Sequence, residues 1–147
     1  MIIKVNIKIE SSIENLDASG LCEGEAEKSV SQAMGSYRYS DGEAFLSFNE
    51  QTDGGKCHTE IVCLGGQVTV RRSGAIESEM RFAEGESHSS IYAIPPYKFD
   101  ATVSTRRIRL DLTNEGGRID LFYNMKIGGA DKSARMRIWI SQASSQI

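Results

Sequence analysis

Glycine-containing pairs at short, regular intervals constrain the fold of this chain more than any other feature of its sequence. Most of them are roughly 9 to 13 residues apart, and each can supply the positive φ angles that tight hairpin turns require. The pairs are Asp41-Gly42, Gly54-Gly55, Gly65-Gly66, Ser73-Gly74, Glu84-Gly85, Gly116-Gly117 and Gly128-Gly129. Between them lie segments rich in Val, Ile, Phe, Tyr and Thr, which favour strands. Short strands joined by tight turns pair with their sequence neighbours, so we predict an antiparallel up-and-down meander.

Apolar and polar residues alternate within most of these segments. In residues 1–10 the isoleucines from Ile3 onwards share a face with Val5, opposite Lys4 and Lys8, and residues 119–127 and 136–140 alternate in the same way. A sheet with one dry face is suited to wrapping around its own core, and closure removes exposed edges. We therefore predict an all-β fold, a meander closed into a small barrel of about 8–10 strands. A two-sheet sandwich is the alternative.

The alternation changes phase between residues 98 and 112. Apolar residues occupy odd positions from Phe99 to Val103 and even positions from Ile108 to Leu112. We predict a hairpin with its turn near Thr105-Arg106, and a β-bulge is the alternative. Residues 11–21 are predicted to form at most one helical turn.

The size and composition of the chain indicate one ordinary globular unit. Its 147 residues are 39% hydrophobic and 25% charged, so we expect residues 1–147 to form a single β-barrel domain. Three irregularly spaced cysteines predict no disulfide framework. No apolar run is long enough for a membrane helix, and the N-terminus alternates like a strand rather than a signal peptide. We expect a cytoplasmic protein with no membrane association.

The charge is small in total and unevenly distributed. A net charge of −3 argues against non-specific binding to nucleic acid. Residues 1–65 carry 5 basic and 11 acidic groups, whereas residues 66–147 carry 12 and 9. In a closed sheet the two halves would form opposite walls of unlike charge. A polar molecule could bind between such walls, but an ordinary solvated surface explains the uneven charge equally well.

Several short motifs together resemble a known family. They are Arg72-Ser73-Gly74, Met80, Phe82, Gly85, Tyr92 and Pro95, preceded by Gly35-x-Tyr37 and Phe48-Asn49-Glu50. In order and spacing they resemble the YwiB-like bacterial proteins of unknown function, over about residues 22–142. The resemblance implies a calycin-like β-barrel, the architecture of lipocalins and fatty-acid binders, and it implies no established activity. The chain departs from the family at Ile94-Pro95-Pro96-Tyr97, where Thr-Pro-Tyr-Gly is usual, and it lacks the Gly-x-Trp of lipocalins.

Strand direction and alternation predict one polar cluster inside the barrel. Glu50 and Arg72 each end a strand on its apolar face, and Thr59 begins the strand between them. Antiparallel order brings these three to the same barrel mouth. Tyr92 also ends its strand at that mouth, but the sequence does not determine whether its side chain points into the barrel or away from it.

Two interpretations of this cluster stay open. In the first, Glu50 and Arg72 form a buried ion pair that closes one end of the core, because an inward arginine needs a partner. In the second, Arg72 binds the carboxylate or phosphate headgroup of a small amphipathic ligand whose apolar tail the barrel holds, since the planar guanidinium meets such anions with two bonds. The second is our leading functional hypothesis, a non-enzymatic one.

The sequence predicts no catalytic, metal or cofactor site. Cys57, His58 and Cys63 do not form a zinc site, because His58 faces away from both cysteines on one strand. Neither His58 nor His88 has an identifiable nucleophile beside it, and both are expected at the surface. An enzyme is therefore not expected, and no cofactor is predicted.

Late strands carry a basic band on their wet faces. It comprises Arg106, Arg107, Arg109, Arg118, Arg135 and Arg137, with Trp139, Phe122 and Tyr97 expected nearby. Such a face could stack and bind RNA or could dock an acidic protein. Solvated strand faces also have this composition, and Asp111 and Asp120 interrupt the band. An interaction module that uses these arginines is the alternative function, although we expect nucleic acid to be a poor partner.

Overall fold

The computed structural model describes residues 1–143 and consists of ten β-strands. They are β1 (Ile2–Leu16), β2 (Cys22–Ser40), β3 (Glu43–Thr52), β4 (Gly55–Leu64), β5 (Gln67–Gly74), β6 (Glu77–Phe82), β7 (Ser87–Ile94), β8 (Tyr97–Thr113), β9 (Gly116–Ile127) and β10 (Ala130–Gln142). Every strand pairs antiparallel with its sequence neighbours, and β1 closes the sheet against β10. The predicted closed meander is therefore confirmed. Within the described residues no helix has the length and apolar character needed to cross a membrane.

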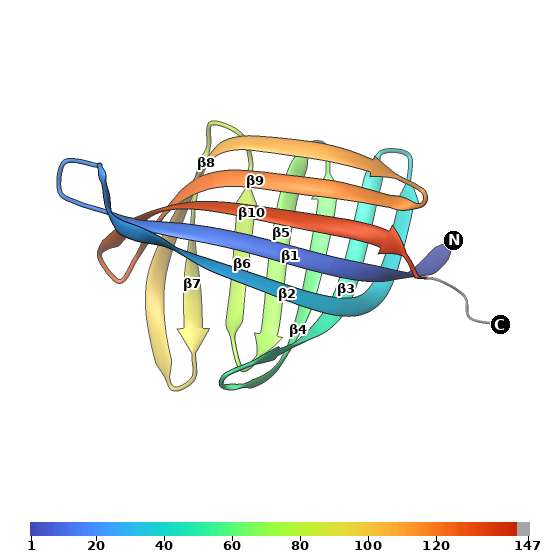
Figure 1. Cartoon of the computed structure of the whole chain (residues 1–147), viewed down its shortest axis with the longest axis horizontal. Coiled ribbons are helices and arrows are strands. Elements are labelled where there is room, and N and C mark those ends of the chain that lie inside the picture. Colours follow the sequence, from blue (N-terminus) through green and yellow to red (C-terminus); the bar gives the residue numbers. More distant parts are fainter. Residues whose placement is uncertain (144–147) are drawn as a thin grey trace.

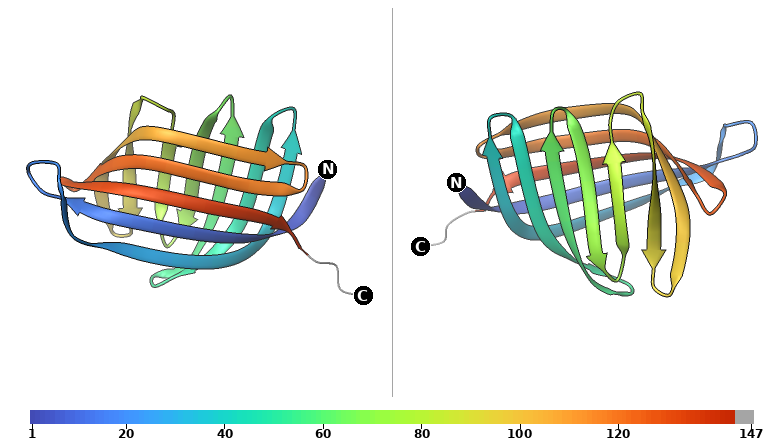
Figure 2. Two further views of the ribbon diagram at one scale, coloured as in Figure 1. Left: turned by 45° about the horizontal axis from the view of Figure 1, so that its top comes forward. Right: turned by 180° about the vertical axis from the view of Figure 1, so that it is seen from behind.

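The barrel has two sides whose strands cross. The long strands β8, β9, β10, β1 and β2 run side by side on one side, and β3 to β7 cross behind them (Figure 1). The view from behind brings β3 to β7 to the front (Figure 2). The chain passes from one side to the other within β2, which pairs with β3 only from Gly35 to Ser40. At Gly35 a side chain would collide with the Ser47 carbonyl oxygen and with Phe48 Cβ, so only glycine permits this close approach.

Side chains fill the barrel interior. Alternate residues of nearly every strand are buried, as the period-two pattern predicts, and Tyr37, Leu46 and Phe82 are among the largest of the fully buried ones. The Tyr37 hydroxyl donates a hydrogen bond to the Thr113 carbonyl oxygen at 2.7 Å, which connects β2 to the end of β8 across the barrel. The interior is thus a packed core.

The predicted hairpin near Thr105-Arg106 is wrong. β8 is one continuous strand, and its register against β9 shifts between Thr105 and Arg107. The extra residue, Arg106, is a β-bulge, which was the alternative interpretation. The bulge moves the inward positions from odd to even numbers, so Val103 before it and Ile108 after it both face the core.

The connection between β6 and β7 holds this bulge in place. Thr105 Oγ1 accepts a hydrogen bond from the buried amide of Ala83 at 3.2 Å. The Thr105 backbone exchanges two further bonds with this connection, from Gly85 N at 2.9 Å and to Glu86 O at 3.0 Å. The Ile108 amide donates to Glu84 Oε1 at 2.7 Å. The bonds to β8 satisfy backbone groups that lie beyond Ser104, where the pairing of β8 with β7 ends.

Residues 11–21, for which the sequence allowed at most one helical turn, contain no helix. β1 continues to Leu16, and a turn closed by Asp17 leads into β2. Asp17 Oδ1 accepts hydrogen bonds from the amides of Ser19 and Leu21, at 2.8 and 3.0 Å. The β1–β2 hairpin projects beyond the rest of the barrel (Figure 1). Within the part of the chain that is described, β2 is paired only to β1 from residue 22 to residue 34.

Candidate functional site

Four inward-facing side chains from four neighbouring strands form a row across the barrel wall. Thr59 of β4 is the register partner of Arg72 of β5. Ser78 of β6 comes next, between Arg72 and Tyr92 of β7. Thr59 and Ser78 are buried, and Arg72 and Tyr92 are half-buried. Tyr92, whose facing the sequence left open, therefore points inward.

Glu50 lies beside this row near the end of β3. Its Oε2 is 3.8 Å from Arg72 Nε and accepts a hydrogen bond from Thr59 Oγ1 at 3.3 Å. The Arg72 side chain is 19% exposed and the Glu50 side chain 13%, so the pair lies at the rim of the core rather than within it. The structure thus brings together Glu50, Thr59 and Arg72, as the alternating strand directions predict.

Protein groups hold Arg72 only loosely. Its Nε atom is buried and has no hydrogen-bond partner among the described residues. The 3.8 Å separation from Glu50 is too long for a hydrogen bond, so the contact is electrostatic. Because a guanidinium carries five N–H donors, Arg72 keeps the capacity to bind another acceptor.

A buried tyrosine lies beneath this group. Burial raises the pKa of Tyr123 to about 12, and the nearby positive charge of Arg72 partly opposes that increase. The Tyr123 ring packs edge-on against Phe82, with 4.9 Å between the ring centroids. The floor of the site is therefore apolar and excludes water.

The barrel is open to solvent at this end. The β3–β4, β5–β6 and β7–β8 turns lie together below the front strands, and β2 is the lowest of those strands (Figure 1). Side chains that face inward are exposed there. Ser31, which is the register partner of Ile9, is exposed, and Phe99, the partner of Tyr92, is 39% exposed. We call this opening, bordered by Glu50, Arg72, Tyr92 and Phe99, the mouth.

The mouth is shallow. Five prominent hollows over residues 1–143 are lined by residues other than Glu50, Thr59, Arg72 and Tyr92. Ser78 of the row, however, lines a hollow between β6 and β7. The core beneath the mouth is occupied by side chains such as Phe82 and Tyr123. A molecule bound to Arg72 would therefore lie across the opening, not deep within the barrel.

Two residues at the mouth, Ser78 and Phe99, are not among the predicted site residues. Ser78 could have been found, because it alternates with Met80 and Phe82 on the inward face of β6. Phe99 was assigned to the dry face, but nothing in the sequence indicated that this part of the face is open to solvent.

On the outside, neighbouring strands bring the predicted arginines together. Asp120 of β9 has Arg109 of β8 and Arg137 of β10 as register partners. Asp120 is only 1% exposed, and both of its oxygens accept hydrogen bonds from Arg118, at 3.1 and 2.8 Å. This interaction raises the pKa of the Arg118 guanidinium. Arg107 of β8 and Arg135 of β10 are the register partners of Phe122, which lies between them on β9.

Basic side chains cover the aromatic rings of this outer face. The Arg135 guanidinium carbon lies 4.5 Å from the centroid of the Phe122 ring. Lys8 Nζ and the Arg118 guanidinium carbon lie 5.4 and 5.5 Å from the centroid of Trp139. Tyr97 is the first residue of β8, whereas the register places Trp139 beside the last residues of β8. Tyr97 is therefore not near Trp139, contrary to the prediction.

The histidines and cysteines form no metal site within the described residues. Cys57 and Cys63 are buried, whereas His58 is exposed and bonds Asn49 Oδ1 at 2.8 Å. The prediction that His88 is a surface residue holds only in part, because its side chain is 28% exposed. It faces inward opposite Val103, is half-buried, and has its Nε2 3.3 Å from Glu86 Oε1. No serine or cysteine hydrogen bond to either histidine is present in residues 1–143.

These features define the chain as a ten-stranded antiparallel β-barrel with a polar mouth at one end. It belongs to the family described as Domain of unknown function (DUF1934), whose model matches residues 7–140. It is 31% identical over 124 residues to the uncharacterized beta-barrel protein YwiB of Bacillus subtilis (strain 168), covering 84% of this chain and 82% of that protein. The crystal structure of the Bacillus subtilis protein matches with a TM-score of 0.84 and 28% identity, over 97% of this chain and 94% of the other. The predicted family resemblance is confirmed. Membership in this family supports the barrel fold and implies no particular activity.

Proposed function

We propose that this barrel binds a small, partly apolar molecule with an acidic headgroup, and that Arg72 binds the headgroup at the mouth. The observation that carries the proposal is the loose hold on Arg72. Its only described ion pair is with Glu50 at 3.8 Å, and its buried Nε has no hydrogen-bond partner among the described residues. A guanidinium that protein groups leave unsatisfied at the rim of an apolar core favours a carboxylate or phosphate ligand.

The surroundings of Arg72 support an amphipathic ligand. Ser78, its register partner on β6, adds a hydroxyl group that can donate a hydrogen bond to a headgroup oxygen. Tyr92 and Phe99, further along the same row, offer aromatic surface that is not fully buried. An apolar tail lying over these rings would remove them from water, which contributes roughly 25 cal/mol per Å² of apolar surface.

Glu50 competes with the ligand for Arg72. Its carboxylate neutralises part of the arginine charge and repels an approaching anion. Replacing Glu50 with glutamine removes this competitor and leaves Arg72 in place. Glu50→Gln is therefore expected to tighten ligand binding, and Arg72→Gln to abolish it. A purely structural ion pair would produce neither effect.

Native mass spectrometry of the purified protein tests the proposal. We expect a co-purified small molecule in the wild-type chain that is lost in Arg72→Gln. Arg71→Gln is the matched control, because Arg71 is the next residue, is exposed, and pairs with Glu79 at 3.2 Å on the outer face. Retention of the molecule in a folded Arg72→Gln variant, or equal loss in both variants, would contradict the proposal.

The arginine face supports a second candidate function, an interaction module for RNA or an acidic protein. The favouring observation is that Arg107, Arg109, Arg135 and Arg137 meet on one outer face of three adjacent strands. Retention on an RNA column that falls with salt, and that weakens in an Arg107→Glu and Arg109→Glu double variant, would support this function. Absence of retention at low salt would remove the RNA form of it.

A further inference from the structure

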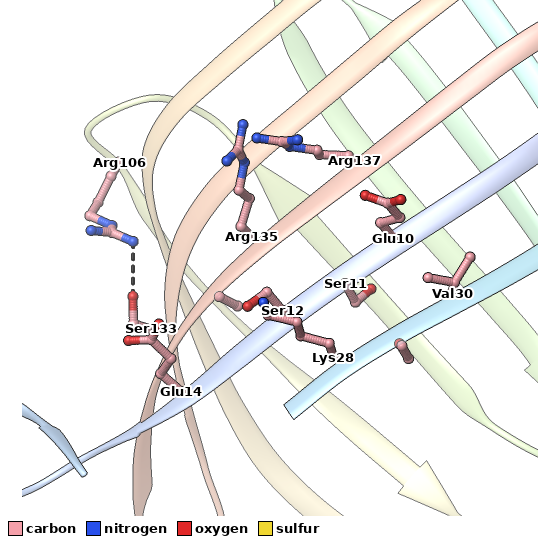
Figure 3. Close-up of a pocket in the computed structure, with 12 residues that line it drawn as sticks. Glu10, Ser11, Ser12, Glu14, Lys28, Val30, Arg106, Ser133, Arg135 and Arg137 are labelled. Atoms are coloured by element: carbon pink, nitrogen blue, oxygen red, sulfur yellow. Dashed lines mark hydrogen bonds between the residues drawn. The ribbon is translucent and has the colours of Figure 1, made fainter. Parts of the chain in front are cut away.

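A hollow of about 530 Å³ lies beside the arginines, and most of its lining residues occupy outward-facing positions of β1, β2 and β10. It extends over β1, β2 and β10 to the bulge of β8, and four of its lining residues are the cations Arg106, Arg135, Arg137 and Lys28 (Figure 3). A hollow of this size is in the range of small-molecule sites. It is separate from the mouth, and neither its residues nor its strands are those of the Arg72 row.

The bulge in β8 contributes one of these cations. Arg106 is the extra residue of the bulge, and its Nη2 donates a hydrogen bond to Ser133 Oγ of β10 at 2.9 Å. This bond directs the guanidinium toward β10 at one edge of the hollow, and Arg135 lies between Arg106 and Arg137 in this view (Figure 3). The hydroxyl groups of Ser12 and Ser133 also line the hollow and add uncharged hydrogen-bonding groups.

Protein acceptors do not satisfy the two central arginines. The Nε atoms of Arg135 and Arg137 are buried and have no hydrogen-bond partner within the described residues. Asp120, the carboxylate opposite Arg137 in the register, already accepts two hydrogen bonds from Arg118. Burial and then the positive charge of Arg137 lower the pKa of Arg135. Crowded cations of this kind favour an anion between them.

The carboxylates at the edge of the hollow have their own partners. Glu10 pairs with Lys8, with 3.4 Å between Oε1 and Nζ, and Glu14 Oε2 accepts a hydrogen bond from the Cys22 thiol. The four cations that line the hollow outnumber these two acidic groups. The hollow therefore keeps an excess of positive charge.

We propose that this hollow is a binding site for the phosphate group of a small molecule. Arginine forks and serine hydroxyls are the groups that recognise phosphate oxygens. A compact phosphate compound fits better than an RNA strand, because Arg135 covers Phe122 and both Lys8 and Arg118 flank Trp139. These rings do not offer the free faces on which bases stack.

Isothermal titration of the full chain with inorganic phosphate, at constant ionic strength, tests the site. We expect saturable binding at one site that weakens about 10-fold or more in an Arg135→Gln and Arg137→Gln double variant. Lys28→Gln, a change at an exposed position on β2, provides a second variant that leaves the arginine cluster intact. Arg109→Gln is the matched control, since it removes one charge from the same face but does not line the hollow. Arg72→Gln is expected to leave phosphate binding unchanged, which separates this site from the mouth.

Two further titrants distinguish the sources of the phosphate group. We expect uridine 5′-monophosphate to bind with the same dependence on Arg135 and Arg137 as inorganic phosphate. A single-stranded oligoribonucleotide without a terminal phosphate is expected to bind more weakly than the monophosphate. The proposal is overturned if inorganic phosphate shows no saturable binding. It is also overturned if Arg109→Gln weakens binding as much as the double variant, or if the oligonucleotide binds more tightly than the monophosphate, because either result describes an extended polyanion surface.

Discussion

Arg72 Nε and Glu50 Oε2 lie 3.8 Å apart at the rim of the barrel core, on strands that are separated by β4. Because the pair is partly exposed and makes no direct hydrogen bond, its contribution to stability lies between those of surface pairs and fully buried pairs. We expect Glu50→Gln to lower the free energy of unfolding by about 1–3 kcal/mol, measured by urea denaturation. The exposed pair Arg71–Glu79 provides the control.

Glu79→Gln breaks that outer pair, whose atoms are 3.2 Å apart. Its expected cost is less than about 1 kcal/mol, as for other exposed pairs. Equal costs for Glu50→Gln and Glu79→Gln would show that the environment of the Glu50 carboxylate differs little from a solvated one. The mouth would then lack the partly dry character that the binding proposal requires.

The turns and the two faces of most strands were predictable because each depends on local chemistry. Glycine pairs permit positive φ angles, and an alternating strand has only one way to bury its apolar residues. The meeting of Glu50, Thr59 and Arg72 follows from the same rules, since parity sets the face and antiparallel order sets the end.

Features that depend on contacts distant in sequence were not predictable. The β8 bulge is stabilised by hydrogen bonds from the β6–β7 connection to Thr105, and a change of phase alone does not distinguish a bulge from a hairpin. Asp120 occupies a wet-face position but is buried, because Arg118 and its cross-strand neighbours cover it. The inward position of His88 had no sequence signal, since the residues next to it, Ser87, Ser89 and Ser90, are all polar.

The bulge offers a direct test of this explanation. Thr105→Val keeps the shape of the side chain but removes the oxygen that accepts the hydrogen bond from the buried Ala83 amide. Leaving that amide unsatisfied is expected to cost about 1–3 kcal/mol of unfolding free energy. Thr102→Val, at a half-buried position on the same strand, is the control. Hydrogen exchange at Ala83 should accelerate in the first variant only, and unchanged protection there would contradict the assigned role of Thr105.

Stability is expected to fall at alkaline pH. Burial raises the pKa of Cys63 from 9.0 to about 12 and the pKa values of Tyr37 and Tyr123 from 10.0 to about 12. At pH values between the ordinary pKa and the raised pKa of each group, the group stays protonated in the folded chain but loses its proton in the unfolded chain. The stability that the neutral groups provide is therefore complete below about pH 9 and is lost progressively as the pH rises towards 12.

The unfolding free energy, measured at a series of pH values, checks this expectation. Tyr123→Phe should flatten the decline between about pH 10 and 12, because the group that titrates in the unfolded chain is gone. A variant whose pH dependence equals that of the wild type would show that Tyr123 keeps an ordinary pKa in the folded barrel.

The three thiols are expected to differ in reactivity. Cys22 is exposed, whereas Cys57 and Cys63 are buried, so only Cys22 should react with a thiol reagent in the native protein. The hydrogen bond to Glu14 is the main cause that raises the pKa of Cys22. Glu14→Gln is expected to lower that pKa and to speed labelling at pH 8, because the thiolate is the reactive form. A labelling rate that does not increase would exclude the Glu14 contact as the cause.

Arg72 is proposed to bind an acidic headgroup at the open end of the barrel. The most direct test is an NMR titration of backbone amides with octanoate and, separately, with 1-octanol, which has the same tail without the charge. We expect saturable shifts near Arg72, Ser78 and Tyr92 with octanoate, much weaker ones with octanol, and none near these residues with octanoate in Arg72→Gln. Equal responses to the two probes, or an undiminished octanoate response in Arg72→Gln, would contradict it.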